Sequence, residues 1–172
     1  DSDSIFARSH TIFVEGDKLY CGYVHGGITG NTSMSVFSLA DPVKPKLLRN
    51  LNQDYPEIDV VHDMFVRHDT IYASCGNQGL FIYKFQGDSI FKLIGSLTGY
   101  DDIGYNHSSV LSGDGKTLFF CDEMPDGKLV KVVDVSDMDA IAVIKMFQSH
   151  PGATAHNPYI VGDKLLIAYY ED

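Results

Sequence analysis

Four histidines recur along the chain at a nearly constant interval. They lie about 45 to 52 residues apart, close to the length of one repeat in several β-repeat proteins. Each histidine opens the same local pattern, which is a short apolar run, a tight polar turn and a second apolar run. A neutral imidazole can bind a transition metal, exchange a proton or hydrogen-bond a backbone group. The four histidines are His10, His62, His107 and His156.

The second apolar run of each pattern ends near another polar residue. Two antiparallel strands joined by a tight turn place the first residue of one strand opposite the last residue of the other. If the first strand of each repeat is innermost, we expect all eight side chains to gather at one mouth of a central channel. Aligned on their turns, the segments predict the pairs His10 with His25, His62 with Asn77, His107 with Glu123, and His156 with Glu171.

Imidazoles that face carboxylates could bind a divalent metal ion as a cofactor. Nitrogen ligands suit zinc, copper, iron and nickel, and a carboxylate widens the choice. The expected metal ligands are His107, Glu123, His156 and Glu171. A metal with an open coordination position could activate water, so a metal-dependent hydrolase or lyase is one candidate function. The structural alternative is that each histidine hydrogen-bonds the backbone of a neighbouring repeat and joins the two.

The elements that position these histidines are predicted to be strands. The apolar runs are short, rich in Val, Ile, Tyr and Phe, and bounded by Gly and Asp turns that are typical of hairpins. In the first three repeats a second pair of strand-like runs follows the first. No window keeps an apolar period of about 3.6 residues, so we expect very little helix. Four antiparallel strands in each repeat predict an all-β chain with the β-propeller fold.

The predicted blades belong to one partial propeller domain that covers residues 1–172. Their expected bounds are 9–53, 61–98, 106–148 and 155–172, and the last blade holds only two strands. The chain therefore accounts for about three and a half blades of a larger ring. A ring of about six to eight blades would need roughly two to four blades more.

Composition and charge narrow the possible partners. The chain has 23 acidic and 13 basic residues, and its net charge of −10 disfavours binding to nucleic acid or to anionic lipid. No apolar run approaches the roughly 18 to 20 residues that span a bilayer, so we expect no membrane insertion by this segment. Cys21, Cys75 and Cys121 are too few and too far apart for a disulfide framework, and we expect buried strand thiols.

No recognised catalytic motif accompanies the histidines. The sequence lacks a Gly-rich phosphate loop, a Ser nucleophile elbow and a Cys/His/Asn signature. Asp63 and Asp122 flank the histidine positions, and we expect them to cap blade junctions rather than to act as acid or base. These observations favour a non-catalytic binding scaffold over an enzyme.

Short motifs recur in register along nearly the whole chain. They are SH at 9–10, VHD at 61–63, GLFIY at 79–83, YNH at 105–107, DE at 122–123, VDVSD at 133–137, AHN at 155–157 and YY at 169–170. In these motifs the sequence resembles the choice-of-anchor B family, whose propeller domain is built from LVIVD-type repeats. It departs from the family pattern at Lys84, where an acidic residue is usual.

The resemblance implies a location more than a chemistry. Members of this family are exported bacterial proteins that are secreted or held at the cell surface. The expected function is therefore an exported or cell-surface scaffold that presents its loops and channel mouth to a protein or glycan. Its partner could also be a larger surface complex. The family resemblance assigns no reaction.

Overall fold

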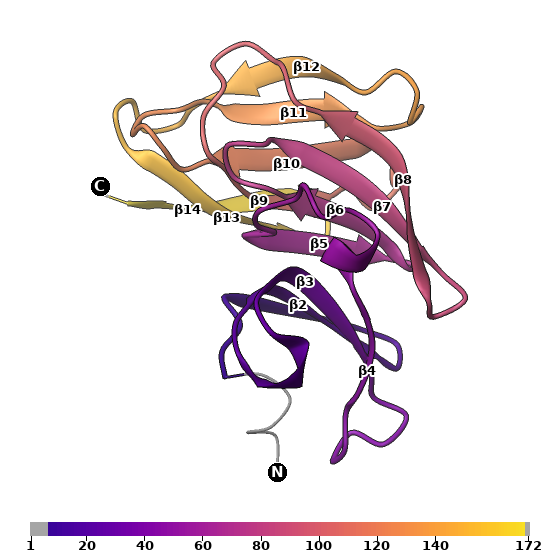
Figure 1. The fold of residues 1–172 in the computed structure, drawn as a ribbon. Helices are drawn as coiled ribbons and strands as arrows, with labels where there is room; N and C mark the ends of the chain where they lie inside the picture. Colours follow the sequence, from indigo (N-terminus) through magenta and orange to yellow (C-terminus); the bar gives the residue numbers. More distant parts are fainter. Residues whose placement is uncertain (1–6, 171–172) are drawn as a thin grey trace.

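The computed structural model describes residues 7–170, which form three four-stranded sheets and one two-stranded sheet (Figure 1). The first sheet consists of β1 (Thr11–Glu15), β2 (Lys18–Val24), β3 (Thr32–Ser38) and β4 (Lys46–Asn50). The second consists of β5 (Asp63–Arg67), β6 (Thr70–Ser74), β7 (Leu80–Gln86) and β8 (Ile90–Leu97). The third consists of β9 (Asn106–Leu111), β10 (Thr117–Asp122), β11 (Val130–Asp134) and β12 (Ala142–Phe147), and the fourth of β13 (Thr154–Val161) and β14 (Lys164–Tyr170).

Helix is confined to two single turns in this part of the chain. They are η2 (Gly27–Thr29) and η3 (Leu51–Gln53), each of three residues. Neither of these described helices has the length or apolar character that a bilayer crossing needs. The prediction of very little helix is confirmed.

Each sheet is an antiparallel meander whose strands follow one another in chain order. Tight turns close the first hairpins, as where Glu15 pairs with Lys18 across Gly16 and Asp17. Gly16 has a φ of 60°, a left-handed conformation that glycine adopts without steric cost. Successive four-stranded meanders are the blades of a β-propeller, so the predicted fold class is confirmed.

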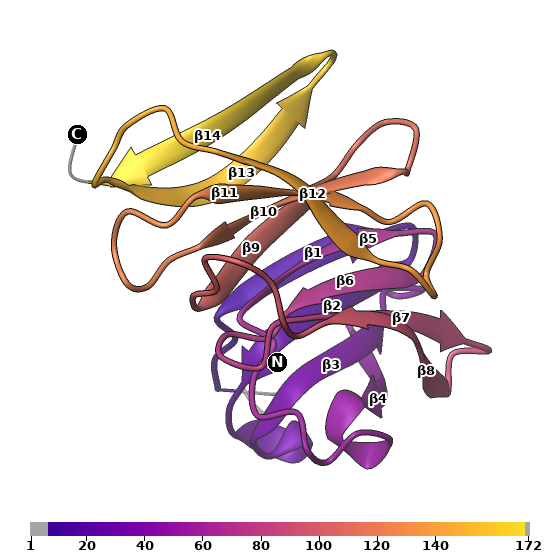
Figure 2. The same ribbon diagram turned by 90° about the horizontal axis from the view of Figure 1, so that it is seen from above.

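The first strand of each sheet lies innermost. Strand β1 packs against β5, β5 against β9, and β9 against β13, so the four strands lie side by side in chain order (Figure 2). Their side chains line a groove of about 520 Å³ that includes Phe13, Phe65 and Tyr159. The starts of these four strands are therefore brought together at one end of the groove.

Apolar side chains fill the space between neighbouring sheets. Alternate residues of a strand point to opposite faces of its sheet, so the second sheet is buried on both faces. Ile71 and Tyr83 pack toward the first sheet, whereas Tyr72 and Ile82 pack toward the third. Full burial of one large apolar side chain contributes about 1.5–3 kcal/mol, so these interfaces hold the blades together.

The first two blades approach closely where β1 meets β5. A Cβ atom on Gly22 would lie 2.6 Å from the backbone oxygen of Val61, so only glycine fits without a backbone shift. Across the same junction, the Thr11 hydroxyl donates a 2.8 Å hydrogen bond to Asp63 Oδ1. Asp63 also accepts a hydrogen bond from the N–H of Met64. Asp63 therefore caps a blade junction, as predicted.

The three cysteines are free and buried, as predicted. Cys21 and Cys121 lie on β2 and β10, and Cys75 directly follows β6. Burial raises the pKa of Cys21 and of Cys121 to about 12. The thiols therefore stay protonated and pack as small apolar groups.

A buried charge cluster lies in the third blade, and the sequence patterns did not predict it. Lys131 on β11 and Asp122 on β10 have fully buried side chains, with 2.9 Å between Lys131 Nζ and Asp122 Oδ2. Lys131 Nζ also lies 3.1 Å from Asp102 Oδ2. Tyr100 and the N–H of Gly104 donate hydrogen bonds to Asp122, which ties the connection between β8 and β9 to the third blade.

Removal of the buried ammonium is expected to destabilise the protein strongly. The substitution Lys131→Met keeps most of the length of the side chain but leaves the Asp122 carboxylate buried without its cation. Loss of one partner of a buried ion pair costs about 3–5 kcal/mol. Urea unfolding followed by circular dichroism measures the change in the free energy of unfolding.

Lys128→Met is the matched control for this prediction. Lys128 Nζ lies 3.0 Å from Asp102 Oδ1, but its side chain is 18% exposed, against 0% for Lys131. A more exposed ion pair contributes about 1 kcal/mol or less, so Lys128→Met is expected to have a small effect. Similar losses for the two variants would contradict a special role for the buried pair.

Candidate functional site

A continuous row of four imidazoles crosses the channel mouth. The ring centres of His10 and His62 lie 4.1 Å apart, those of His62 and His107 lie 4.5 Å apart, and those of His107 and His156 lie 4.0 Å apart. Each ring comes from a different blade. The structure therefore brings together all four histidines that recur in the sequence.

Each histidine lies at the start of an innermost strand. His10 and His62 directly precede β1 and β5, whereas His107 and His156 lie within the first residues of β9 and β13. The backbone N–H of His10 donates to Gly22, and that of His62 donates to Ser74, so both are fixed to the second strand of their own blade. Because the inner strands pack side by side, equivalent positions in successive blades become neighbours.

The strand register differs from the predicted pairing of the histidines. His25 pairs with Arg8 rather than His10, and the backbone N–H of Glu123 bonds to Tyr105 rather than His107. His156 pairs with Ala168. Two-residue turns and bulges move the partner of each histidine to an earlier residue of the second strand, which is why alignment on the turns misplaced it.

The residues predicted to pair with the histidines do not all lie at the channel mouth. Glu123 reaches the histidine row, with 3.7 Å between its Oε2 atom and His107 Nε2. His25 lies in an adjoining pocket of about 280 Å³ that His10 also lines. Asn77 is exposed in the turn between β6 and β7 and does not line the mouth. Glu171 lies outside the described residues.

The histidine row lines a pocket of about 340 Å³ at the channel mouth. Its lining residues all carry a polar group, and they include side chains that the sequence patterns did not select for the site. Tyr170 is one of them, and its ring centre lies 4.4 Å from that of His156. Its position one residue before Glu171 was the available signal. The lining residues are His10, Thr11, His62, Asp63, His107, Glu123, His156, Asn157 and Tyr170.

Burial keeps the central imidazoles neutral. It lowers the pKa of His62 to about 4, with a further contribution from the neighbouring His10. Burial and the other three histidines lower the pKa of His107 to about 3. The pKa of His156 is also lowered by burial, although the nearby Glu123 opposes this shift. Neutral imidazoles keep a lone pair that can accept a hydrogen bond or bind a metal.

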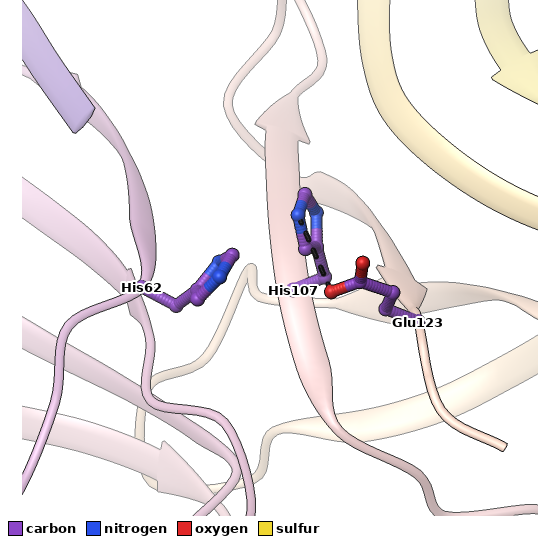
Figure 3. Close-up of side chains that lie close together, drawn as sticks. All are labelled: His62, His107 and Glu123. Atoms are coloured by element: carbon purple, nitrogen blue, oxygen red, sulfur yellow. Dashed lines mark ion pairs between the residues drawn. The ribbon is translucent and has the colours of Figure 1, made fainter. Parts of the chain in front are cut away.

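One group of side chains in the described region could hold a metal ion. The ligand atoms of His62, His107 and Glu123 all lie within 4.8 Å of one another (Figure 3). The predicted set was His107, Glu123, His156 and Glu171, so the structure retains two of its members and adds His62. The reason is the close packing of β5 on β9, which brings His62 beside His107.

Comparisons with known proteins support the fold and assign no family. No protein-family model and no curated protein matches the chain. The Kluyveromyces lactis protein Hsv2p is 13% identical, with a TM-score of 0.62 over 96% of this chain and 47% of that chain. A luciferin-regenerating enzyme is 11% identical, with a TM-score of 0.51 over 80% of this chain and 45% of that chain. This chain thus spans about half the length of each, and the similarity shows a β-propeller fold alone.

The free energy of unfolding is expected to fall as the pH drops from about 6.5 toward 4. In this range His62 and His107 bind protons in the unfolded chain but remain largely neutral in the folded chain, so protonation favours unfolding. A pKa lowered from 6.5 to about 4 corresponds to a loss of about 3 kcal/mol at the acid end. Urea unfolding at several pH values, with a chelator present, measures this loss.

A variant with both His62→Asn and His107→Asn is the control. Asparagine is polar but cannot be protonated in this pH range, so the variant should lose most of the pH dependence between 6.5 and 4. The same pH dependence in both proteins would assign the effect to other groups.

Proposed function

We propose that this chain belongs to an exported or cell-surface β-propeller that acts as a binding scaffold and engages its partner at the channel mouth. The observation that carries this proposal is the convergence of four histidines from four blades on one polar pocket. The resemblance to the choice-of-anchor B family supports an exported location. The expected partner is a protein or a glycan at the cell surface, alone or within a larger complex.

The size and charge of the pocket favour a small polar group of that partner. A volume of about 340 Å³ lies near the lower end for ligand sites, so it suits one sugar ring or one side chain rather than a large molecule. Imidazole nitrogens, the carboxylates of Asp63 and Glu123, and the Asn157 amide can donate or accept hydrogen bonds there. These groups match the hydroxyls of a sugar better than an apolar ligand.

Metal-dependent hydrolysis is the second candidate function. The group of His62, His107 and Glu123 favours it, because two imidazoles and a carboxylate can leave a coordination position open for water. A lyase could use the same group.

Binding of the purified protein to an array of cell-surface glycans tests the scaffold proposal. We expect retention on a subset of glycans and about tenfold weaker binding by His156→Asn, because loss of a polar contact in the pocket costs about 1.4 kcal/mol. His68→Asn is the matched control, since His68 is an exposed histidine of the turn between β5 and β6.

Three outcomes of the glycan experiment separate the possibilities. Equal binding by His156→Asn and the unchanged protein would remove the channel mouth as the binding site. Absence of binding to any glycan, together with absence of binding to surface protein extracts, would contradict the scaffold proposal. Turnover of a bound glycan would favour the enzymatic candidate.

Cell fractionation tests the proposed location. An antibody against the chain should detect it in the medium or on intact cells, where added protease removes the surface signal. A cytoplasmic marker protein should remain intact in the same sample. Recovery of the chain in the cytoplasmic fraction alone would contradict export.

A further inference from the structure

Three potential metal ligands approach one another at the channel mouth from two blades. His62 precedes β5, His107 lies on β9, and Glu123 follows β10. Figure 3 shows His62 extending toward His107 from one side and Glu123 from the other. The three side chains thus come from segments that are distant in the sequence.

The chemistry of these donors selects a class of ion. Two imidazole nitrogens and one carboxylate oxygen form a set that proteins use for zinc and for ferrous iron. Calcium and magnesium prefer sets made only of oxygen atoms. A first-row divalent transition metal is therefore the class of ion that fits.

The spacing of the ligand atoms is wider than in a loaded site. A tetrahedral ion with ligand distances of about 2.1 Å holds its ligand atoms about 3.4 Å apart. The distance from His107 Nε2 to Glu123 Oε2, 3.7 Å, is close to this value. The largest separation in the group, up to 4.8 Å, must shorten by as much as about 1.4 Å. Glu123 can move, because its side chain is 29% exposed, whereas that of His107 is 6% exposed.

Buried ring nitrogens supply a second, independent observation. Nδ1 of His107 and Nδ1 of His62 are buried and form no hydrogen bond with the described residues. A buried polar atom without a partner costs about 1–3 kcal/mol, and native proteins seldom leave two of them side by side. Both rings line the pocket at the channel mouth, so an ion bound there could give such a nitrogen its missing partner.

We propose that His62, His107 and Glu123 bind a divalent transition-metal ion such as Zn²⁺ at the channel mouth. The role of the ion in partner binding rests on the proposed function, because that function places the partner in this pocket. Three protein ligands leave one coordination position of a tetrahedral ion open. A hydroxyl or carboxylate oxygen of the partner can take that position, so the ion selects partners that carry such an oxygen.

The two outer histidines of the row then have a positioning role. His10 contacts His62 and His156 contacts His107, with ring centres 4.1 and 4.0 Å apart. Contact with these rings limits rotation of the two proposed ligands. His10 and His156 therefore restrict the geometry of the site without being counted among its ligands.

Binding of Zn²⁺ alone to the intact chain tests the inference. The protein is stripped with a chelator, dialysed and titrated with Zn²⁺, and the bound metal is measured by equilibrium dialysis and elemental analysis. We expect one equivalent of Zn²⁺ and a visible absorption spectrum when Co²⁺ replaces it. Excess Ca²⁺ or Mg²⁺ should not displace either ion.

Matched variants decide whether these residues are the ligands. Glu123→Gln should weaken Zn²⁺ binding by at least about tenfold, as even changes outside a ligand set commonly do. The double variant His62→Asn and His107→Asn should lose the stoichiometric site. His68→Asn, which removes a histidine elsewhere, should bind Zn²⁺ like the unchanged protein. Because Glu123 is partly exposed, Glu123→Gln should unfold at the same urea concentration as the metal-free protein, which separates loss of a ligand from loss of the fold.

Several results would overturn the inference. They are absence of stoichiometric Zn²⁺, unchanged binding by Glu123→Gln and the double variant, or an equal loss in His68→Asn. Since Zn²⁺ binding needs no partner, it is independent of the glycan and fractionation experiments. Partner binding without stoichiometric metal would refute the metal site and leave the scaffold proposal standing. Metal binding without any partner would support the metal site and contradict the scaffold proposal.

Discussion

Apolar packing between neighbouring sheets draws β1, β5, β9 and β13 together. Each of these strands starts near a histidine, so the packing that buries Tyr83 and Phe120 also places the four imidazoles in a row, with the centres of neighbouring rings 4.0–4.5 Å apart. Charged rings at that spacing would repel each other and lose their hydration, so burial favours the neutral form. The hydrophobic core and the chemical character of the channel mouth therefore have the same cause.

The two polar clusters of the molecule are buried in different ways. Lys131 stays beside two carboxylates, Asp102 and Asp122, so opposite charge compensates its loss of water. The central histidines instead lose their charge, because burial disfavours the charged form and the neighbouring imidazoles repel it. One cluster contributes to the folded state of the third blade, and the other leaves nitrogen atoms available to a ligand.

Features that depend on local sequence could be predicted, whereas those that depend on exact register or on distant segments could not. Turn residues and apolar runs are local, so the blades and the recurrence of His10 in later repeats were visible. The partner of His156 depended on a bulge between His156 and Pro158, which shifts the pairing by one residue. Pro158 was a signal for that bulge, since proline donates no backbone hydrogen bond within a sheet. The burial of Lys131 depends on Asp102, which approaches it only in the folded chain.

The blades repeat the histidine but do not repeat its acidic neighbour. Among the described residues, Glu123 is the acidic side chain that lies within ion-pair distance of a histidine of the row, whereas Asp63 in the same pocket accepts hydrogen bonds from Thr11 and Met64. The four nearly equivalent imidazoles therefore become unequal. Internal duplication can supply copies of a ring nitrogen, but identical copies give no preferred point along the row. The carboxylate of Glu123 breaks this internal symmetry, because it lies beside His107. The row therefore has a direction, from His107 through His62 to His10. Such asymmetry lets a repetitive scaffold distinguish one end of a bound group from the other.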